Sequence, residues 1–331
     1  MKEFKLLRIV FMGTPEFAVA SLDALVNAGC NIVGVITAPD KAAGRGLQLQ
    51  QSAVKKYAVE KGLHVLQPEK LKNPEFLYEL KALNADLQVV VAFRMLPEAV
   101  WNMPPLGSVN LHGSLLPQYR GAAPINWAVI NGEKETGVTT FKLKQEIDTG
   151  DILLQESFVI AETDNAGDVH DKMKVIGANL LVRTLKGLAD GTLKEIPQSA
   201  IVNRDSHGVS SELQEPNPLL TTHHVHLKHA PKIFTETCRI NWSKPVDEVY
   251  NLIRGLAPYP AAFTFLNDKK LKVFKAEKGN NTDSFTPGSF KTDHKTYLHF
   301  DCANGYISIL ELQFEGKKKL LIADFLRGYR F

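Results

Sequence analysis

Apolar runs alternate with amphipathic stretches through the first part of the chain. Leu6 to Met12 is a short apolar run typical of a buried strand, and Glu16 to Ala28 repeats apolar residues at helical spacing. The alternation continues, with strand-like patterns at 32–37, 86–92, 107–112, 136–143 and 151–160 and helical patterns at 52–61, 73–82 and 166–189. We expect Asp164 to cap the last helix. Alternating strands and helices predict a Rossmann-like α/β domain with a mostly parallel sheet.

The pattern changes beyond this alternating region. Residues 203–230 are polar and irregular, and 245–256 is one amphipathic helix. Short strand-like runs then follow between Asn, Asp and Gly residues, at 262–266, 271–274, 297–300, 306–312 and 320–323. This pattern predicts a small OB-like β-barrel. We therefore expect an α/β domain over 1–203, a linker over 204–229 and a C-terminal domain over 230–331.

Composition narrows the classes of protein. Of 331 residues, 44% are hydrophobic and 23% are charged, as in globular proteins, and no run approaches the roughly 18 apolar residues of a membrane span. The start of the chain lacks the features of a secretion signal, and three cysteines are too few for a disulfide framework. We expect a monomeric protein of the reducing cytoplasm with no membrane contact.

Positive charge is concentrated toward the C-terminus. Residues 230–331 contain 16 Lys and Arg residues against 11 Asp and Glu residues, whereas residues 1–229 contain 23 against 25. Such an excess fits either a solvated surface or a contact with nucleic acid. Five lysines around Phe274 would form a basic face of the small barrel, as in OB-like domains that bind nucleic acid: Lys269, Lys270, Lys272, Lys275 and Lys278.

Polar residues that close strands are the first candidates for chemistry, because open α/β sheets bind ligands beyond the carboxyl ends of their strands. Gly13-Thr14-Pro15 follows the first strand, but it lacks the glycines of GxGxxG and gives little support to a dinucleotide-dependent dehydrogenase. Asn110 and His112 are two residues apart, so an extended strand places both on one face. Asp148 lies in a later turn and reaches His112 if the two strands are neighbours.

An Asn, a His and an Asp suit the attack of an amine on a carbonyl carbon. A His oriented by a carboxylate relays a proton, and an amide N–H stabilises the developing oxyanion. This chemistry needs no nucleophilic side chain, and Ser114 is a poor hydrolase nucleophile because GxSxG is absent. Taken alone, each of the three residues is more typical of a structural role in a strand end or a turn.

The stretch Asn110-Leu-His-Gly-Ser-Leu-Leu-Pro117, with the later Asp148-Thr-Gly150, resembles the signature of the formyltetrahydrofolate-dependent formyltransferases. The resemblance implies formyl transfer from 10-formyltetrahydrofolate to an amine without a metal, and it makes Asn110, His112 and Asp148 the catalytic trio. It also implies that two segments contact the folate, namely Ser114, Leu115, Leu116 and Pro117, and Phe93, Arg94, Met95 and Leu96.

Four further segments resemble the branch of this family that formylates methionyl initiator tRNA: Met12–Ala18, Ala38–Gly46, Arg120–Pro124 and Arg239–Trp242. That resemblance implies initiator methionyl-tRNA as the partner. We expect tRNA contacts from a long loop over 38–46 and from the basic C-terminal domain, at Lys41, Arg45, Lys232, Lys269, Lys270 and Lys272. The alternative interpretation of residues 38–46 is a flexible surface loop without a role in binding. Glu146-Ile147 departs from the family pattern and adds a charge beside Asp148.

Alternatives stay open at this point. Glycinamide ribonucleotide formyltransferases resemble only the catalytic domain, whereas the sugar-nucleotide formyltransferases come closer, since Ile125–Trp127 and Asn131–Glu133 resemble their versions. A non-catalytic RNA-binding protein is the alternative from another class. Four histidines in the linker have spacing compatible with a metal site, but we expect a solvated loop because no cysteine or carboxylate set accompanies them: His223, His224, His226 and His229.

Overall fold

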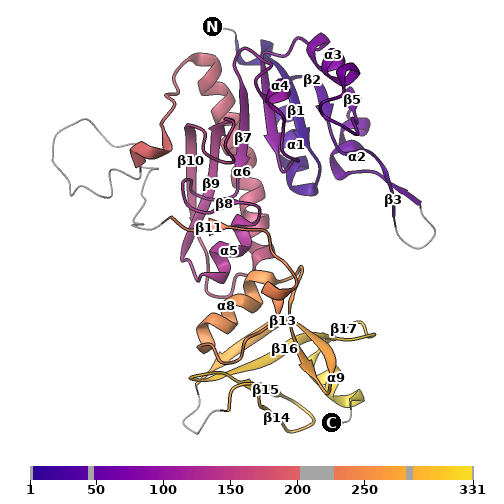
Figure 1. Cartoon of the computed structure of the whole chain (residues 1–331), viewed down its shortest axis with the longest axis vertical. Coiled ribbons are helices and arrows are strands. Elements are labelled where there is room, and N and C mark those ends of the chain that lie inside the picture. The colour runs from indigo at the N-terminus through magenta and orange to yellow at the C-terminus, as the bar shows by residue number, and fades with distance from the viewer. Residues whose placement is uncertain (1–2, 44–47, 202–226, 281–285, 330–331) are drawn as a thin grey trace, which may run out of the picture. The chain divides into compact units, whose positions relative to one another are not determined.

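The computed structural model describes residues 3–43, 48–201, 227–280 and 286–329 (Figure 1). Contacts divide the chain into two compact units. The first unit consists of Met1–Arg120, Gly137–Ser157 and Lys172–Lys228, and the second of Gly121–Thr136, Phe158–Asp171 and His229–Phe331. Two segments that the sequence placed in the α/β domain therefore group with the C-terminal residues. Most of the expected linker lies outside the described residues.

The described part of the first unit is built around a seven-stranded sheet with the order β10-β9-β7-β6-β1-β2-β5. Its strands are β1 (Arg8–Gly13), β2 (Asn31–Ile36), β5 (Val65–Leu66), β6 (Leu87–Val91), β7 (Ser108–His112), β9 (Glu135–Lys142) and β10 (Ile152–Val159). The first five pair in parallel, and β9 pairs antiparallel with β7. The predicted α/β fold with a mostly parallel sheet is confirmed.

The two central strands are β1 and β6. Ile9, Val10, Phe11 and Met12 of β1 are fully buried, as expected for a parallel strand covered on both faces. The chain runs from β1 outward to β5 and then returns to the other side of β1 as β6. Ligands of open α/β sheets bind at such a reversal of strand order, beyond the carboxyl ends of the strands.

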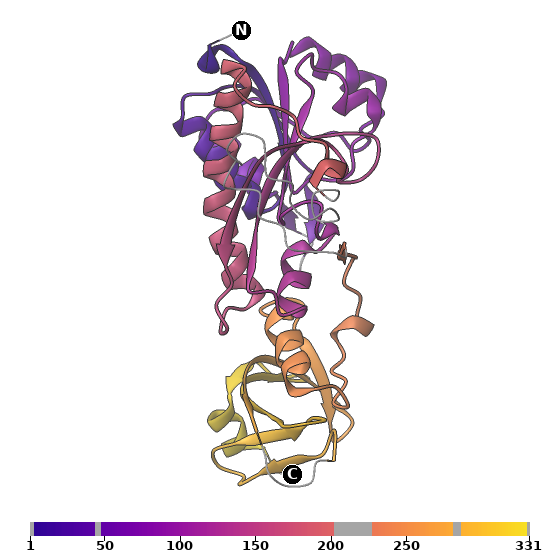
Figure 2. The ribbon, with the colours of Figure 1, turned by 90° about the vertical axis from the view of Figure 1, so that its left-hand side faces the viewer.

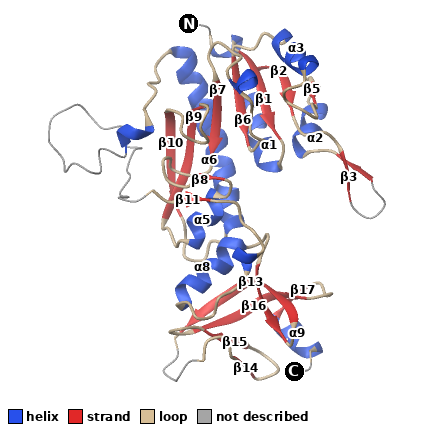
Figure 3. Ribbon diagram, viewed as in Figure 1, coloured by secondary structure: helices blue, strands red, loops and turns tan. Residues whose placement is uncertain are grey.

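Helices flank this sheet (Figure 3). They are α1 (Glu16–Asn27), α2 (Ala53–Glu60), α3 (Pro74–Ala82), α4 (Glu98–Trp101) and α6 (Ala166–Asp190), and a short 3-10 turn (Phe4–Leu6) precedes β1. The long helix α6 runs along the sheet (Figure 2). The hydroxyls of Thr184 on α6 and Thr140 on β9 lie 2.8 Å apart, and a Cβ on Gly177 of α6 would lie 2.9 Å from the Leu111 side chain on β7. Among the described residues, no helix has the length and apolar character needed to cross a membrane.

The cap of helix α6 differs from the prediction. The side-chain oxygen of Asn165 accepts hydrogen bonds from the N–H groups of Gly167 (2.7 Å) and Asp168 (3.2 Å). Asp164 instead accepts from the N–H of Ala161 at 2.7 Å. The expected cap at Asp164 was wrong because the helix begins two residues after it, so its carboxylate closes the preceding turn.

The long loop after β2 contains a hairpin, although the sequence predicted only a loop. Strands β3 (Lys41–Ala43) and β4 (Gln48–Gln50) pair antiparallel and extend away from the sheet (Figure 3). At the base, Lys55 Nζ lies 2.5 Å from Asp40 Oδ2, and Gln67 Nε2 donates to Asp40 Oδ1 and to the Ala38 carbonyl, each at 2.8 Å. These bonds fix where the hairpin leaves the sheet. Arg45 lies outside the described residues.

An antiparallel sheet forms most of the second unit. Its strands in spatial order are β12 (Ala262–Leu266), β13 (Lys269–Gly279), β16 (Tyr306–Phe314), β15 (Leu298–Asp301) and β14 (Phe290–Thr292), and β17 (Lys319–Leu321) pairs with β16. The expected small β domain is confirmed. The predicted strand at 320–323 was wrong beyond Leu321, because the chain continues as helix α9 (Ile322–Gly328). A short apolar run fits a strand or a buried helix equally well.

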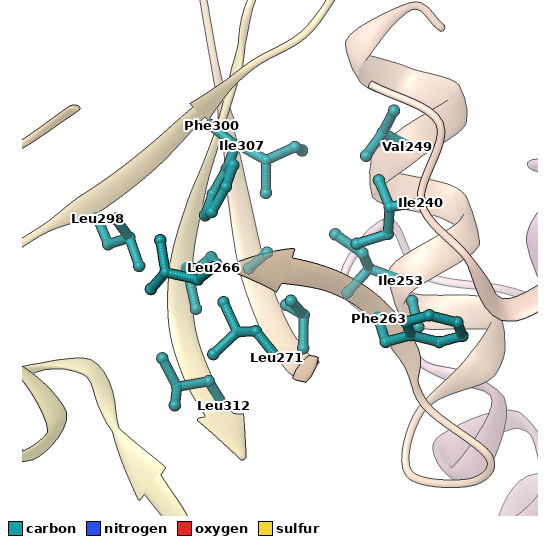
Figure 4. Packing of buried hydrophobic residues seen from close by; sticks show 14 of the residues in the cluster. Ile240, Val249, Ile253, Phe263, Leu266, Leu271, Leu298, Phe300, Ile307 and Leu312 are labelled. Carbon is teal, nitrogen blue, oxygen red and sulfur yellow. The ribbon is translucent and has the colours of Figure 1, made fainter. Parts of the chain in front are cut away.

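The core of the second unit lies between this sheet and helix α8 (Val246–Leu256) (Figure 4). Val249 and Ile253 of α8 face buried residues of the strands, including Leu271 and Leu312. Helix α5 (Pro124–Ile130) packs on α8 so closely that a Cβ on Gly255 would lie 2.5 Å from the Ile130 side chain. Two short strands, β8 (Arg120–Gly121) and β11 (His229–Ala230), pair with each other, and a 3-10 turn spans Glu236–Cys238.

Candidate active site

Asn110 and His112 lie at the carboxyl end of β7, between β6 and β9. Because side chains alternate along a strand, the two residues share one face, as the sequence predicted. The Asn110 side chain is partly buried, and within the described part of the chain its amide has no hydrogen-bond partner. Its N–H groups are therefore available to a ligand.

The imidazole of His112 is buried and held in one orientation. Nε2 lies 2.9 Å from the carbonyl oxygen of Tyr119. A carbonyl only accepts hydrogen bonds, so we assign the ring proton to Nε2, and Nδ1 of the neutral ring carries the lone pair. Nδ1 faces Oδ2 of Asp148 at 3.8 Å, which is too long for a hydrogen bond but places the carboxylate where it attracts the ring once Nδ1 takes up a proton. The structure thus brings His112 and Asp148 together.

The backbone around Asp148 has an unusual conformation. Asp148 has a φ of 55°, in the left-handed region that few residues other than glycine adopt. A Cβ on Gly150 would lie 1.5 Å from the carbonyl oxygen of Lys142, so only glycine fits there. The Thr149 hydroxyl donates to the Glu146 carbonyl at 3.1 Å. Packing and hydrogen bonds together fix the Asp-Thr-Gly turn and so aim Asp148 at His112.

The segment from Ser114 to Pro117 is largely inside the protein. Ser114 is fully buried, and its hydroxyl donates to the Gln118 carbonyl at 2.6 Å. Leu116 is also fully buried, in a small cluster with Phe141 and Ile152. The side chains of Ser114 and Leu116 therefore hold this segment in place. Leu115 is only partly buried, and the predicted folate contacts of the segment stay a prediction.

The loop Phe93–Leu96 follows β6 and lies between two hollows. The first has a volume of about 690 Å³ and is lined by Arg94, Met95 and Leu96 together with Lys70, Lys72 and Leu77 among others. The second has a volume of about 510 Å³ and is lined by Thr14, Ala38, Pro39, Asp40, Lys41, Glu69, Phe93 and Arg94. The second hollow lies where the strand order reverses. Phe93 and Arg94, from one of the two segments predicted to contact folate, thus line the same hollow as Lys41, a predicted tRNA contact.

Several cations of the second unit lie over aromatic rings. Lys270 Nζ is 4.4 Å from the centroid of Phe263, Arg239 lies over Phe265 and Lys232 lies over Phe234. Arg239 also bridges to Phe263, so its segment runs beside β12. Lys269 and Lys272 lie on β13, and Lys272 donates to the Pro260 carbonyl. Within the described ranges, none of these cations has a carboxylate in salt-bridge range.

Lys278 is different, although the sequence predicted it to extend the same basic face. Its Nζ lies 2.6 Å from Asp247 and 2.9 Å from Glu162. The hydrogen bonds to these two carboxylates raise the pKa of Lys278. The basic face is therefore shorter than predicted, because acidic residues distant in the sequence neutralise this lysine.

Three of the four linker histidines lie outside the described residues, and only His229 is described. In the described ranges, no group of three or more His, Cys, Asp or Glu residues is placed to hold a metal ion.

Comparison with known proteins places the chain in a family. The family model for formyl transferases matches residues 7–185, and the model for the formyl transferase C-terminal domain matches residues 232–330. A methionyl-tRNA formyltransferase from Parabacteroides distasonis is 54% identical over 330 residues, which cover 98% of this chain and 96% of the relative. The chain belongs to the methionyl-tRNA formyltransferase family.

Other comparisons agree with this membership. A methionyl-tRNA formyltransferase from Bacteroides fragilis is 51% identical over 98% of this chain and 95% of its own length. Among solved structures, an N-formyltransferase from Helicobacter canadensis, in complex with folinic acid and dTDP-3-aminofucose, matches with a TM-score of 0.63 at 21% identity. The match covers 95% of this chain and 100% of that one, and it shows a shared fold. The sugar-nucleotide alternative is not favoured, since the relatives of high identity are methionyl-tRNA formyltransferases.

Sequence reasoning missed Tyr119 and Gln198, which support the site. Tyr119 acts through its backbone carbonyl, which no side-chain pattern reveals. Gln198 lies 50 residues beyond Asp148 and donates to that residue's carbonyl. Its contribution depends on the fold, and the sequence around it has no motif that would have shown it.

Proposed function

We propose that this protein transfers the formyl group of 10-formyltetrahydrofolate to the free α-amine of methionine esterified to initiator tRNA. The observation that carries the proposal is the buried His112, which faces Asp148 at 3.8 Å and shares its strand face with Asn110, whose amide has no hydrogen-bond partner among the described residues. These groups sit on a chain of the methionyl-tRNA formyltransferase family. We include in the proposal that the enzyme is a cytoplasmic monomer. Sedimentation of the purified protein tests its oligomeric state.

The proposed chemistry uses each group once. The α-amine attacks the formyl carbon, so that a C–N bond forms and the carbonyl oxygen becomes an oxyanion. The Asn110 amide donates a hydrogen bond to that oxyanion. His112 accepts the proton of the attacking amine at Nδ1, and the Asp148 carboxylate stabilises the resulting imidazolium. The bond from the formyl carbon to N10 of the folate then breaks, and His112 returns the proton to N10.

A hollow lined in part by Arg94, Met95 and Leu96 fits a folate. The hollow of about 690 Å³ combines apolar side chains such as Leu77 and Leu96 with the cations Lys70 and Lys72. An aromatic ring system that ends in carboxylates needs such a mixture of surfaces. When bound, 10-formyltetrahydrofolate supplies an activated formyl carbon. We assign its binding to the loop Phe93–Leu96 and the segment Ser114–Pro117.

The tRNA side of the proposal depends on exposed charge. A methionine side chain offers little surface for selection, so contacts to phosphates must position the tRNA. Lys232, Lys270 and Lys272 meet this need because no carboxylate among the described residues neutralises them. We assign the same role to Lys269 and to the hairpin residues Lys41 and Arg45.

The experiment compares three acceptors in the presence of 10-formyltetrahydrofolate: methionyl initiator tRNA, methionyl elongator tRNA and a 4-amino-sugar nucleotide. We expect formylation of the initiator tRNA alone, and its loss in His112→Ala. Formylation of the sugar alone would overturn the tRNA assignment. Formylation of no acceptor would favour a non-catalytic RNA-binding protein.

A further inference from the structure

Gln198 is a buried polar residue next to the candidate active site. Its side chain is only 3% exposed. The residue lies two positions after Ile196, whose backbone exchanges two hydrogen bonds with Ile152, at 2.8 and 2.9 Å. This bridge holds the segment beside the start of β10. A buried amide needs hydrogen-bond partners, and those of Gln198 show what it does.

The amide nitrogen of Gln198 bonds to the turn that carries Asp148. Nε2 donates to the carbonyl of Asp148 and to the carbonyl of Gly150, each at 2.8 Å. The two bonds grip the backbone on both sides of Thr149. They therefore stabilise the left-handed conformation of Asp148, which costs free energy in a residue other than glycine.

Arg120 fixes the orientation of this amide. Its Nε and Nη2 both donate to Oε1 of Gln198, at 3.0 and 2.5 Å. Because Oε1 is occupied by the guanidinium, the NH₂ group must face the turn. Burial lowers the pKa of Arg120, while the charges of Asp148 and Glu146 act in the opposite direction. The charge that Glu146 adds beside the site is therefore partly offset by Arg120.

The same stretch of chain also orients the other member of the pair. Tyr119, which precedes Arg120, bonds through its carbonyl to Nε2 of His112. The backbone N–H of Tyr119 in turn donates to the Lys228 carbonyl at 2.7 Å. Two adjacent residues thus hold His112 directly and Asp148 through Gln198.

We propose that Gln198 and Arg120 are positioning residues that keep Asp148 facing His112 during formyl transfer. The proposal rests on the proposed function. Neither residue need contact a substrate, because each acts through the backbone of the Asp-Thr-Gly turn. Without Gln198 the Asp148 carboxylate is still present, but the backbone that carries it is free to relax. A displacement of about 1 Å lowers the rate by up to about a hundredfold.

The test is a double-mutant cycle on formylation of methionyl initiator tRNA, with Gln198→Ala, Asp148→Ala and the double variant. We expect Gln198→Ala to lower kcat between about tenfold and a hundredfold, with the KM of both substrates within about twofold. In the Asp148→Ala background the same substitution changes kcat less than about twofold. An equal loss in both backgrounds, or no loss in the otherwise native enzyme, would overturn the proposal.

A second variant separates positioning from folding. Gln198→Glu keeps the shape and accepts from Arg120, but an ionised carboxylate cannot donate to the two carbonyls. We expect it to fold, as seen by circular dichroism, and to lose kcat to the same extent as Gln198→Ala. A folded Gln198→Glu enzyme with native kcat contradicts the proposal even if Gln198→Ala does not fold.

A matched control is Gln88→Ala. Gln88 is buried to the same degree and accepts a hydrogen bond from the Ser108 hydroxyl, but it lies at the opposite end of its strand from the site. We expect its kcat to stay within about twofold of the native value, and a loss equal to that of Gln198→Ala would contradict a specific role. If Asp148→Ala itself keeps full formylation activity, the catalytic role of Asp148 and with it the positioning role of Gln198 are wrong, whereas no formylation by the native enzyme would overturn the proposed function.

Discussion

The candidate active site and the basic face of the second unit use polar groups in opposite ways. In the site, His112 and Gln198 are buried, and hydrogen bonds to backbone carbonyls fix each of them. In the second unit, Lys270 lies over the ring of Phe263 and Lys232 over that of Phe234, and no described carboxylate neutralises either lysine. One region fixes geometry, whereas the other presents charge.

This difference teaches how each region should respond to substitution. Formyl transfer needs donors and a base within tenths of an ångström of the reacting atoms, so its groups are held by the packed core. Phosphate contacts tolerate small displacements, because charge attraction falls off slowly with distance. Changes in the site should therefore alter kcat, and changes on the basic face should alter KM and the dependence on salt.

The largest effect is expected from Asn110→Ala. Loss of one oxyanion donor lowers kcat by about a hundredfold to a thousandfold, and the KM for tRNA stays unchanged. Steady-state formylation of methionyl initiator tRNA measures both quantities. Asn27→Ala is the control, because Asn27 is exposed and bonds only to Asp23 among the described residues. A raised KM with native kcat would show that Asn110 binds tRNA instead.

A smaller effect is expected from the double variant Lys270→Ala, Lys272→Ala. We expect the KM for tRNA to rise roughly tenfold, since an ion pair in contact with solvent contributes about 0.2–1 kcal/mol and two are lost. The slope of log KM against log salt should fall by about 0.7–0.9 for each phosphate that the variant no longer neutralises. Lys278→Ala is the matched control with little change in KM, because Asp247 and Glu162 already neutralise Lys278. An equal rise in the KM for tRNA in Lys278→Ala and in the double variant would contradict the shortened basic face.

The smallest effect concerns the base of the β3–β4 hairpin. Hydrogen bonds from Lys55 and Gln67 lower the pKa of Asp40 below its ordinary value of 3.8. Because the pKa is lowered in the folded protein, this bond network stabilises the fold at pH values above the ordinary pKa. The stabilisation is lost as the pH falls through the lowered pKa. An NMR titration of the Asp40 carboxyl carbon should show this shift. In Lys55→Met the pKa of Asp40 should rise toward 3.8. An unchanged titration of Asp40 in this variant would show that Lys55 does not lower its pKa.

Much of the fold could be predicted because its signals are local. The apolar run of β1 and the helical spacing of α1 each specify one element without reference to the rest of the chain. The β3–β4 hairpin was missed because three-residue strands carry no periodicity. Helix α5 was missed for a similar reason, since seven residues give barely two turns of pattern.

In the candidate site, too, features with a local sequence signal could be predicted and features that arise only on folding could not. Asn110, His112 and Asp148 were predicted from spacing and from a resemblance, and the structure places His112 beside Asp148. The support from Tyr119 and Gln198 could not be predicted, because backbone carbonyls and a distant amide meet only after folding. The pairing of Lys278 with Glu162 was hidden for the same reason.

Single-turnover formylation of methionyl initiator tRNA tests most directly the claim that one region fixes geometry and the other presents charge. Rates are measured against enzyme concentration for the native enzyme, Asn110→Ala and the Lys270→Ala, Lys272→Ala variant. We predict that Asn110→Ala lowers only the rate constant at saturating enzyme, and that the lysine variant raises only the enzyme concentration needed for half saturation. If both variants change the same constant, the division between geometry and charge is wrong.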